Sequence, residues 1–144
     1  MTLHVPSEPI RSSVGTRLMS RVLRSPFGRR LSKSLVILRL RGRNSGERFD
    51  LPVQYATVRS GLIVMPGKPE TKQWWRNLRA PQAIEVLRDG TWHHARGIVL
   101  YEVDAEYADA LASYRERWPR VRIPRGQLLV LVTWLDERDQ AAAA

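Results

Sequence analysis

Short segments in which apolar and polar residues alternate, separated by tight turns, constrain the fold of this chain most. Residues 48–58 show the alternation most clearly. Their apolar side chains fall on every second position: Phe49, Leu51, Val53 and Tyr55. This period of two is typical of a β-strand with one buried face. Residues 83–87 and 92–103 flank Asp89-Gly90, a pair that favours a two-residue hairpin turn.

The remaining segments complete a mainly β pattern. Further strands are predicted at residues 35–40, 62–65 and 127–135. Helices are predicted at residues 12–23, at residues 71–79 and after Asp104, which is a suitable N-cap. The apolar face of the last helix would contain Tyr107, Leu111, Tyr114 and Trp118. Many short strands with few helices predict an α+β fold, mainly β with flanking helices, built around a small antiparallel barrel.

Length and composition favour a single globular domain. The chain has 144 residues, of which 43% are hydrophobic, and it contains no cysteine. Disulfides and cysteine-ligated zinc are therefore excluded. No apolar run is long enough to span a bilayer. We expect a loose tail at residues 1–10, one domain at residues 11–137 and a disordered tail at residues 138–144.

A formal net charge of +10 indicates acidic partners, such as phosphorylated coenzymes, anionic lipids or nucleic acid. The predicted helix at residues 12–23 is basic and amphipathic, so contact with an anionic membrane surface is one hypothesis. Nucleic acid ranks last, because the arginines are scattered over every element and the tryptophans lie in apolar segments.

Residues 41–48 form the first candidate site. Arg41, Arg43 and Arg48 surround two glycines and Ser45 at a predicted turn between strands. Guanidinium groups bind phosphate or carboxylate, and glycine allows backbone N–H groups to approach an anion. A solvated hairpin tip explains the same residues equally well.

Residues 74–78, with the sequence Trp-Trp-Arg-Asn-Leu, form the second candidate site. Adjacent helical residues cannot face the same way, so one tryptophan is expected in the core and Trp74 near a ligand ring. Asn77 lies one turn after Trp74 on the same face. Packing of both tryptophans in the core is the alternative.

These two segments together resemble the deazaflavin (coenzyme F-420)-dependent nitroreductase family, split β-barrel oxidoreductases of actinobacteria. The resemblance covers roughly residues 34–100. The matching residues are Gly42, Arg43, Ser45, Gly46, Arg48, Pro52, Tyr55, Trp74, Asn77 and Leu78. The chain departs from the family pattern at Asn44, at the loop 66–69 and at Ala80-Pro81-Gln82.

The resemblance implies an FMN-binding-protein-like split barrel that passes a hydride from reduced coenzyme F-420 to a flat, electron-poor acceptor. The acceptor would be a quinone, an activated alkene or a nitroaromatic. The implied location is cytoplasmic, with possible peripheral contact at the inner face of the membrane. The implied coenzyme-binding residues are Arg41, Arg43, Asn44, Ser45, Gly46, Arg48, Pro52, Met65, Pro66, Gly67, Trp74 and Asn77.

Other assignments stay open at this point. Tyr114 and Trp118 are candidates for the wall of the acceptor site, although helix-to-barrel packing is the better interpretation of Tyr114. No catalytic residue is assigned. No metal is expected, because His93 and His94 point to opposite faces of a strand. Alternatives are an FMN enzyme on the same barrel and a non-enzymatic ligand- or nucleic-acid-binding protein. A homodimer is compatible with the family.

Overall fold

The computed structural model describes residues 34–71 and 73–135 of the chain. The predicted tails at residues 1–10 and 138–144 and the predicted helix at residues 12–23 lie outside this part, so they stay predictions. In order, the elements are β1 (Leu35–Arg41), β2 (Arg48–Gln54), β3 (Ala56–Val58), β4 (Gly61–Val64), the 3-10 helix η1 (Trp74–Leu78), β5 (Gln82–Arg88), β6 (Thr91–Leu100), α3 (Tyr107–Arg117) and β7 (Leu129–Trp134).

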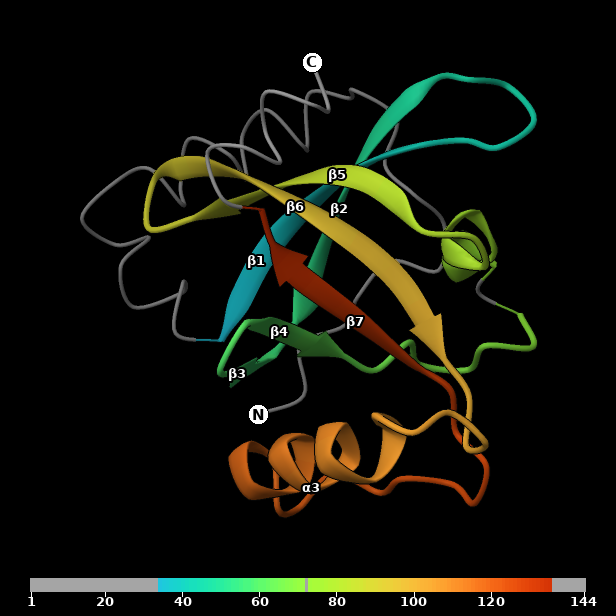
Figure 1. Ribbon diagram of the computed structural model, residues 1–144, viewed down its shortest axis with the longest axis vertical. Helices are drawn as coiled ribbons and strands as arrows, with labels where there is room; N and C mark the ends of the chain where they lie inside the picture. Colours follow the sequence, from blue (N-terminus) through green and yellow to red (C-terminus); the bar gives the residue numbers. More distant parts are fainter. Residues whose placement is uncertain (1–33, 72, 136–144) are drawn as a thin grey trace.

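The strands form one seven-stranded antiparallel sheet in the order β2-β1-β5-β6-β7-β4-β3. Only Tyr55 separates β2 from β3, yet these strands lie at opposite edges of the sheet. The sheet must therefore curl until its edges come close together, as Figure 1 shows. This geometry confirms the predicted split barrel.

The prediction of one continuous strand at residues 48–58 is wrong, because the structure divides this segment at Tyr55 into β2 and β3. The chain leaves its pairing with β1 after Gln54 and pairs with β4 from Ala56 onward. Tyr55 lies at the corner between the two strands and is buried. Alternation continues through a corner of this kind, because the side chain of Tyr55 still enters the core. The pattern therefore does not reveal the change of partner.

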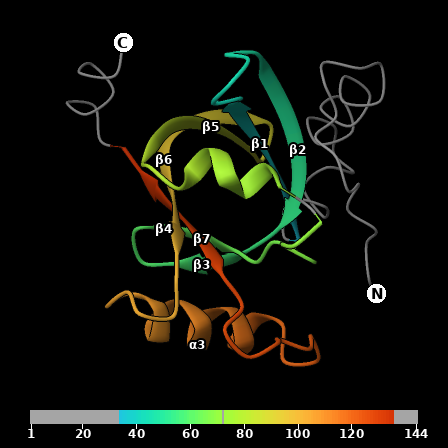
Figure 2. The ribbon, with the colours of Figure 1, turned by 90° about the vertical axis from the view of Figure 1, so that its right-hand side faces the viewer.

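The inside of the barrel holds the main core. Alternate residues of the strands point inward and form one cluster with three residues of η1, Trp74, Trp75 and Leu78. Figure 2 shows η1, in light green, lying across the end of the barrel. Gly97 on β6 permits this position, since a Cβ there would lie 3.2 Å from both terminal methyl groups of Leu78.

The predicted helix at residues 71–79 is shorter in the structure and is a 3-10 helix. It covers Trp74–Leu78, and its N-cap residue, Gln73, makes no side-chain capping hydrogen bond. Three of its five residues are buried in the barrel end. Packing in the barrel end therefore determines the short 3-10 form of this segment.

Helix α3 covers the outside of the sheet over β3, β4 and β7 (Figures 1 and 2). Tyr107, Ala110 and Tyr114 pack there against Ile63 and Leu129. The part of the chain that the structure describes holds no helix long and apolar enough to cross a membrane.

The predicted N-cap of this helix is wrong. The cap position is Glu106, which makes no side-chain hydrogen bond. The carboxylate of Asp104 instead accepts a hydrogen bond of 2.7 Å from the Tyr101 N–H. Because β6 ends at Leu100, the chain needs a turn before the helix begins, and Asp104 stabilises that turn.

Candidate functional site

The connection between β1 and β2 is a tight turn held by its own residues. Gly42 N–H donates to the Glu47 carbonyl at 2.9 Å, and Gly46 N–H donates to the Gly42 carbonyl at 2.8 Å. The Ser45 hydroxyl accepts a hydrogen bond of 3.2 Å from Glu47 N–H. A Cβ at Gly42 would lie 2.6 Å from Ser45 Oγ, and Gly46 has a φ of +69°. The backbone path therefore requires glycine at position 46, and Gly42 leaves room for the Ser45 hydroxyl.

The arginines of the turn, Arg41, Arg43 and Arg48, are exposed. Arg41 and Arg48 lie directly opposite each other in the register of β1 and β2, an arrangement that is unfavourable for like charges. Arg41 Nη1 donates to the Gly46 carbonyl at 3.2 Å. Within residues 34–71 and 73–135, no ion pair involves Arg41, Arg43 or Arg48. The turn is therefore suited to an anion from outside.

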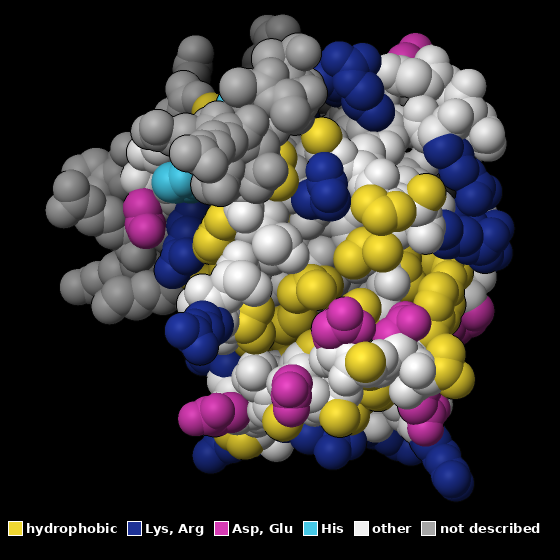
Figure 3. Space-filling model, viewed as in Figure 1, with side chains coloured by type: hydrophobic (Ala, Val, Ile, Leu, Met, Phe, Trp, Pro, Cys, Tyr) yellow, Lys and Arg dark blue, Asp and Glu magenta, His cyan; other side chains and the backbone are white. Residues whose placement is uncertain are grey.

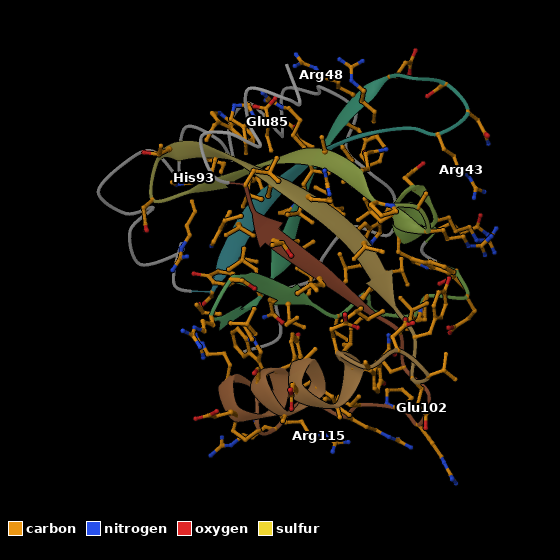
Figure 4. All side chains as sticks on the ribbon, in the orientation of Figure 1. Arg43, Arg48, Glu85, His93, Glu102 and Arg115 are labelled. Atoms are coloured by element: carbon orange, nitrogen blue, oxygen red, sulfur yellow. The ribbon has the colours of Figure 1, made fainter. Side chains whose placement is uncertain are left out.

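The two sequence motifs meet in the structure. Arg43 N–H donates to Asn77 Oδ1 at 2.8 Å, and Asn77 Nδ2 donates to the Trp74 carbonyl at 3.0 Å. The side chain of Asn77 therefore joins the turn to η1. Figure 4 shows Arg43 on the side of the turn near η1, with Arg48 at the other side. In Figure 3, basic side chains gather over this turn and η1.

Gln82, the first residue of β5, holds the turn at a second point. Its side-chain Oε1 accepts from Arg41 N–H at 3.0 Å, and its Nε2 donates to the Arg41 carbonyl at 3.1 Å. The amide thus replaces a strand partner at the end of β1, whose pairing with β5 stops at Arg39. The sequence shows Gln82 only as a departure from the family pattern, so this role was missed.

The loop after β4 reaches the same helix. Met65 is half-buried, Pro66 is buried and Gly67 is exposed. The Trp75 indole N–H donates to the Pro69 carbonyl at 2.9 Å. The predicted coenzyme residues 65–67 and the arginine turn are therefore both attached to η1, although they lie far apart in the sequence.

The two tryptophans of η1 are both buried. Trp74 is 4% exposed and Trp75 is 6% exposed, and both belong to the main core. The expectation that only one would lie in the core is therefore wrong. It assumed α-helical geometry, whereas η1 is a short 3-10 helix inserted into the barrel end, where core surrounds it on more than one face.

Arg76 is a second residue that sequence reasoning missed. Its guanidinium lies 5.6 Å from the Trp75 ring, and Arg79 lies 5.2 Å from the same ring. Arg76 Nη1 donates to Gln73 Oε1 at 3.0 Å. Arg76 Nε is buried and has no hydrogen-bond partner, the one such side-chain atom in the described part of the chain. Nothing in the sequence signals this, because burial of a single atom depends on packing.

Three predicted site residues lie elsewhere. Pro52 lies opposite Ile37 on the outer face of β2, because Leu51 and Val53 point into the barrel. Tyr114 is 2% exposed between α3 and the sheet, and burial raises its pKa to about 12. Trp118 is half-buried, and its indole N–H donates to the Tyr55 carbonyl at 2.9 Å. Packing explains Tyr114, as the better of its two interpretations predicted.

In the described part of the chain, His93 and His94 converge with no other metal-ligating side chains. His93 packs beside the Trp134 ring at a centroid distance of 5.5 Å. Across the described ranges, no group of three or more His, Cys, Asp or Glu residues could hold a metal ion.

A protein-family model matches most of this chain. A family model described as "F420H(2)-dependent quinone reductase" matches residues 14–132, which is more than half of the chain. The match includes the turn, the loop after β4, η1 and α3. No curated protein matches the chain.

Proposed function

The chain belongs to the F420H(2)-dependent quinone reductase family, and from this premise we propose that it transfers a hydride from reduced coenzyme F-420 to a quinone. Membership makes the protein an oxidoreductase that depends on coenzyme F-420. Activated alkenes and nitroaromatics are proposed as further acceptors, because they share with quinones a flat, electron-poor π-system.

The residues around η1 suit an elongated coenzyme with an anionic tail. Arg41, Arg43 and Arg48 are exposed and form no ion pair within the described residues. Arg76 Nε is a buried donor without an acceptor, the kind of atom that a bound group satisfies. These features support binding of the phosphate and carboxylate groups of the tail beside the turn.

The chain's own contribution to the reaction is binding and orientation. A bound deazaflavin supplies a hydride, so the protein needs neither a nucleophile nor a metal for this step. The turn would hold the tail, and Asn77 would hold the turn against η1 through its 2.8 Å contact with Arg43 N–H. The loop 65–67 would hold the ring. Fixing both ends places the reactive carbon at one position relative to the acceptor.

The observation that carries the proposal is the hydrogen bond between Arg43 N–H and Asn77 Oδ1, since it joins the two motifs into one site. The test is parallel titration with oxidised coenzyme F-420, FMN and NADP, followed by quenching of tryptophan emission. We expect coenzyme F-420 to bind most tightly and its reduced form to be oxidised by quinones. Tighter binding of FMN would replace the proposal with the FMN alternative.

Peripheral membrane contact is part of the proposal. The basic, amphipathic sequence at residues 12–23 supports it, and this segment lies outside the described residues. Contact at the cytoplasmic face would bring the protein to lipophilic quinones. The full chain should sediment with anionic liposomes more than a chain that begins at Leu31. Equal sedimentation of the two would disprove the role of this segment.

A further inference from the structure

Gln127 is one of two buried polar or charged residues in the described part of the chain, the other being Asp50. Asp50 pairs with Arg39 at 2.8 Å on the outer face of the sheet. Gln127 lies before β7 and is 6% exposed. Its Nε2 donates to the Pro66 carbonyl at 2.9 Å and to the Leu128 carbonyl at 2.9 Å. The Tyr107 hydroxyl donates to the main-chain carbonyl of Gln127.

The hydrogen bond from Gln127 Nε2 to the Pro66 carbonyl fixes one end of the loop 66–69. The other end is fixed by Trp75, whose indole N–H donates to the Pro69 carbonyl. Between them, the Lys68 carbonyl accepts from the Thr71 N–H at 3.0 Å and from the Thr71 hydroxyl at 3.1 Å. Three carbonyl groups of this short loop are therefore occupied by the protein itself.

The N–H groups of the same loop are in the opposite situation. Gly67 and Lys68 are exposed, and their backbone N–H groups have no acceptor among the residues that the structure describes. Lys68 has a φ of +47°, a left-handed conformation that is unusual for a side-chain-bearing residue. A loop with occupied carbonyls and two unpaired N–H groups is a donor site for a carbonyl oxygen or an anion.

We propose that Gln127 is a positioning residue of the coenzyme-ring site. Its buried amide holds the Pro66 carbonyl and thereby keeps Gly67 N–H and Lys68 N–H available to an oxygen atom of the bound ring. Gln127 acts through the loop and does not itself touch the ring. This inference rests on the proposed function, since it assigns the ring end of coenzyme F-420 to the loop 66–69.

The test compares the affinities of two ligands for three variants. Tryptophan quenching is measured with oxidised coenzyme F-420 and with the same deazaflavin chromophore lacking phosphate and tail. Gln127→Met keeps the size of the side chain and removes both donors. We expect it to lower the affinity for both ligands by the same factor, roughly tenfold, because the loop holds only the ring.

Gln127→Glu supplies a readout that a general packing defect would not produce. An ionised carboxylate would face two carbonyl oxygens, and burial raises the pKa of a carboxyl group in this position. Below that pKa the protonated carboxyl regains one donor. The affinity of Gln127→Glu for both ligands should therefore rise as the pH falls, relative to the wild-type protein and to Gln127→Met.

Tyr107→Phe is the matched control. It removes a hydrogen bond to the main chain of Gln127 and leaves the amide in place, so it should lower the melting temperature without changing either affinity. Wild-type affinity in Gln127→Met would overturn the inference. So would a loss confined to the ligand with the tail, an equal loss in Tyr107→Phe, or a pH-independent Gln127→Glu. Failure of the wild-type protein to bind coenzyme F-420 would instead overturn the proposed function.

Discussion

The arginine turn at residues 41–48 and the loop at residues 66–69 both attach to η1, but they are held in different ways. Hydrogen bonds among Gly42, Ser45, Gly46 and Glu47 form the turn within six residues. The loop has one comparable local contact, from Trp75 to the Pro69 carbonyl six positions earlier, but its other end is fixed by Gln127, which is 61 positions from Pro66. A motif is therefore readable in the sequence where local bonds build it and invisible where distant residues build it.

The two regions also differ in what they offer a ligand. The turn offers exposed guanidinium groups, whose attraction for an anion weakens with salt. The loop offers two backbone N–H groups, and the strength of the hydrogen bonds that they donate depends on geometry. The comparison predicts that the turn binds the charged tail of the coenzyme and that the loop binds its ring.

Removing the support that both regions share should have the largest effect. Leu78 is 0% exposed and packs on Gly97, so Leu78→Ala leaves a cavity beneath η1. We expect the free energy of unfolding to fall by about 2–5 kcal/mol and binding at both ends to weaken. Denaturant unfolding and ligand titration measure this. A loss of tail binding alone would show that the two regions do not share η1.

A smaller effect is expected from the loop alone. Trp75→Phe keeps an aromatic ring in the core and removes the donor to the Pro69 carbonyl. Affinity for coenzyme F-420 and for its tail-less chromophore should fall equally, by roughly fivefold to tenfold, because a partly buried carbonyl loses its partner. Trp92→Phe, outside the site, is the control. A salt-dependent loss would place Trp75 with the turn instead.

The turn alone should give a weaker and salt-sensitive change. Arg43→Ala removes an exposed charge, so we expect a few-fold loss of affinity for coenzyme F-420 at low ionic strength. The loss should shrink in high salt and be absent for the tail-less chromophore. Arg122→Ala, an exposed arginine on the loop after α3, controls for net charge. Equal losses of affinity in both variants would show that Arg43 acts only through the net charge of the protein.

A conservative substitution on the buried face of α3 should change ligand binding at neither the turn nor the loop near neutral pH. Tyr114→Phe keeps the buried ring, so titration at pH 8 should return wild-type affinities for both ligands and a wild-type KM for the quinone. A raised KM would restore Tyr114 to the wall of the acceptor site.

The same variant tests a pH effect on stability. Burial raises the pKa of Tyr114 from 10.0 to about 12, so the folded chain holds this proton more tightly than the unfolded chain. The stabilisation is complete below pH 10 and is lost as the pH rises from 10 toward 12, by about 2–3 kcal/mol. Denaturant unfolding between pH 8 and 11.5 should show a larger loss in the wild-type protein than in Tyr114→Phe, in which Tyr55 and Tyr107, whose pKa values burial also raises, still contribute.

Much of the fold was predictable because its signals are local. Alternation in residues 48–58 and the Asp89-Gly90 turn follow from backbone geometry that each segment imposes by itself. The corner at Tyr55 was not predictable, because a strand can change partners without changing its pattern. The length of η1 was also missed, since burial in the barrel end outweighs helix propensity there.

The residues of the candidate site also divide into those with a local sequence signal and those without one. Its arginine and glycine residues stand out in the sequence, and so does Asn77. Gln82, Arg76 and Gln127 carry no local signal, because an amide or a guanidinium is ordinary until its partner is known. Pro52 matches the motif, yet strand alternation places it on the outer face of the barrel.

By itself, the sequence determined the antiparallel strands, the charged turn and a resemblance to deazaflavin-dependent proteins, since residues close along the chain encode all three. Only the tertiary structure decided that the turn, η1 and the loop 66–69 form one assembly, and that Trp74 and Trp75 are both core. The physical reason is that hydrogen bonds and packing join residues that are adjacent in space. Arg43 and Asn77 are 34 positions apart and Pro66 and Gln127 are 61 positions apart, so no local pattern contains these pairs.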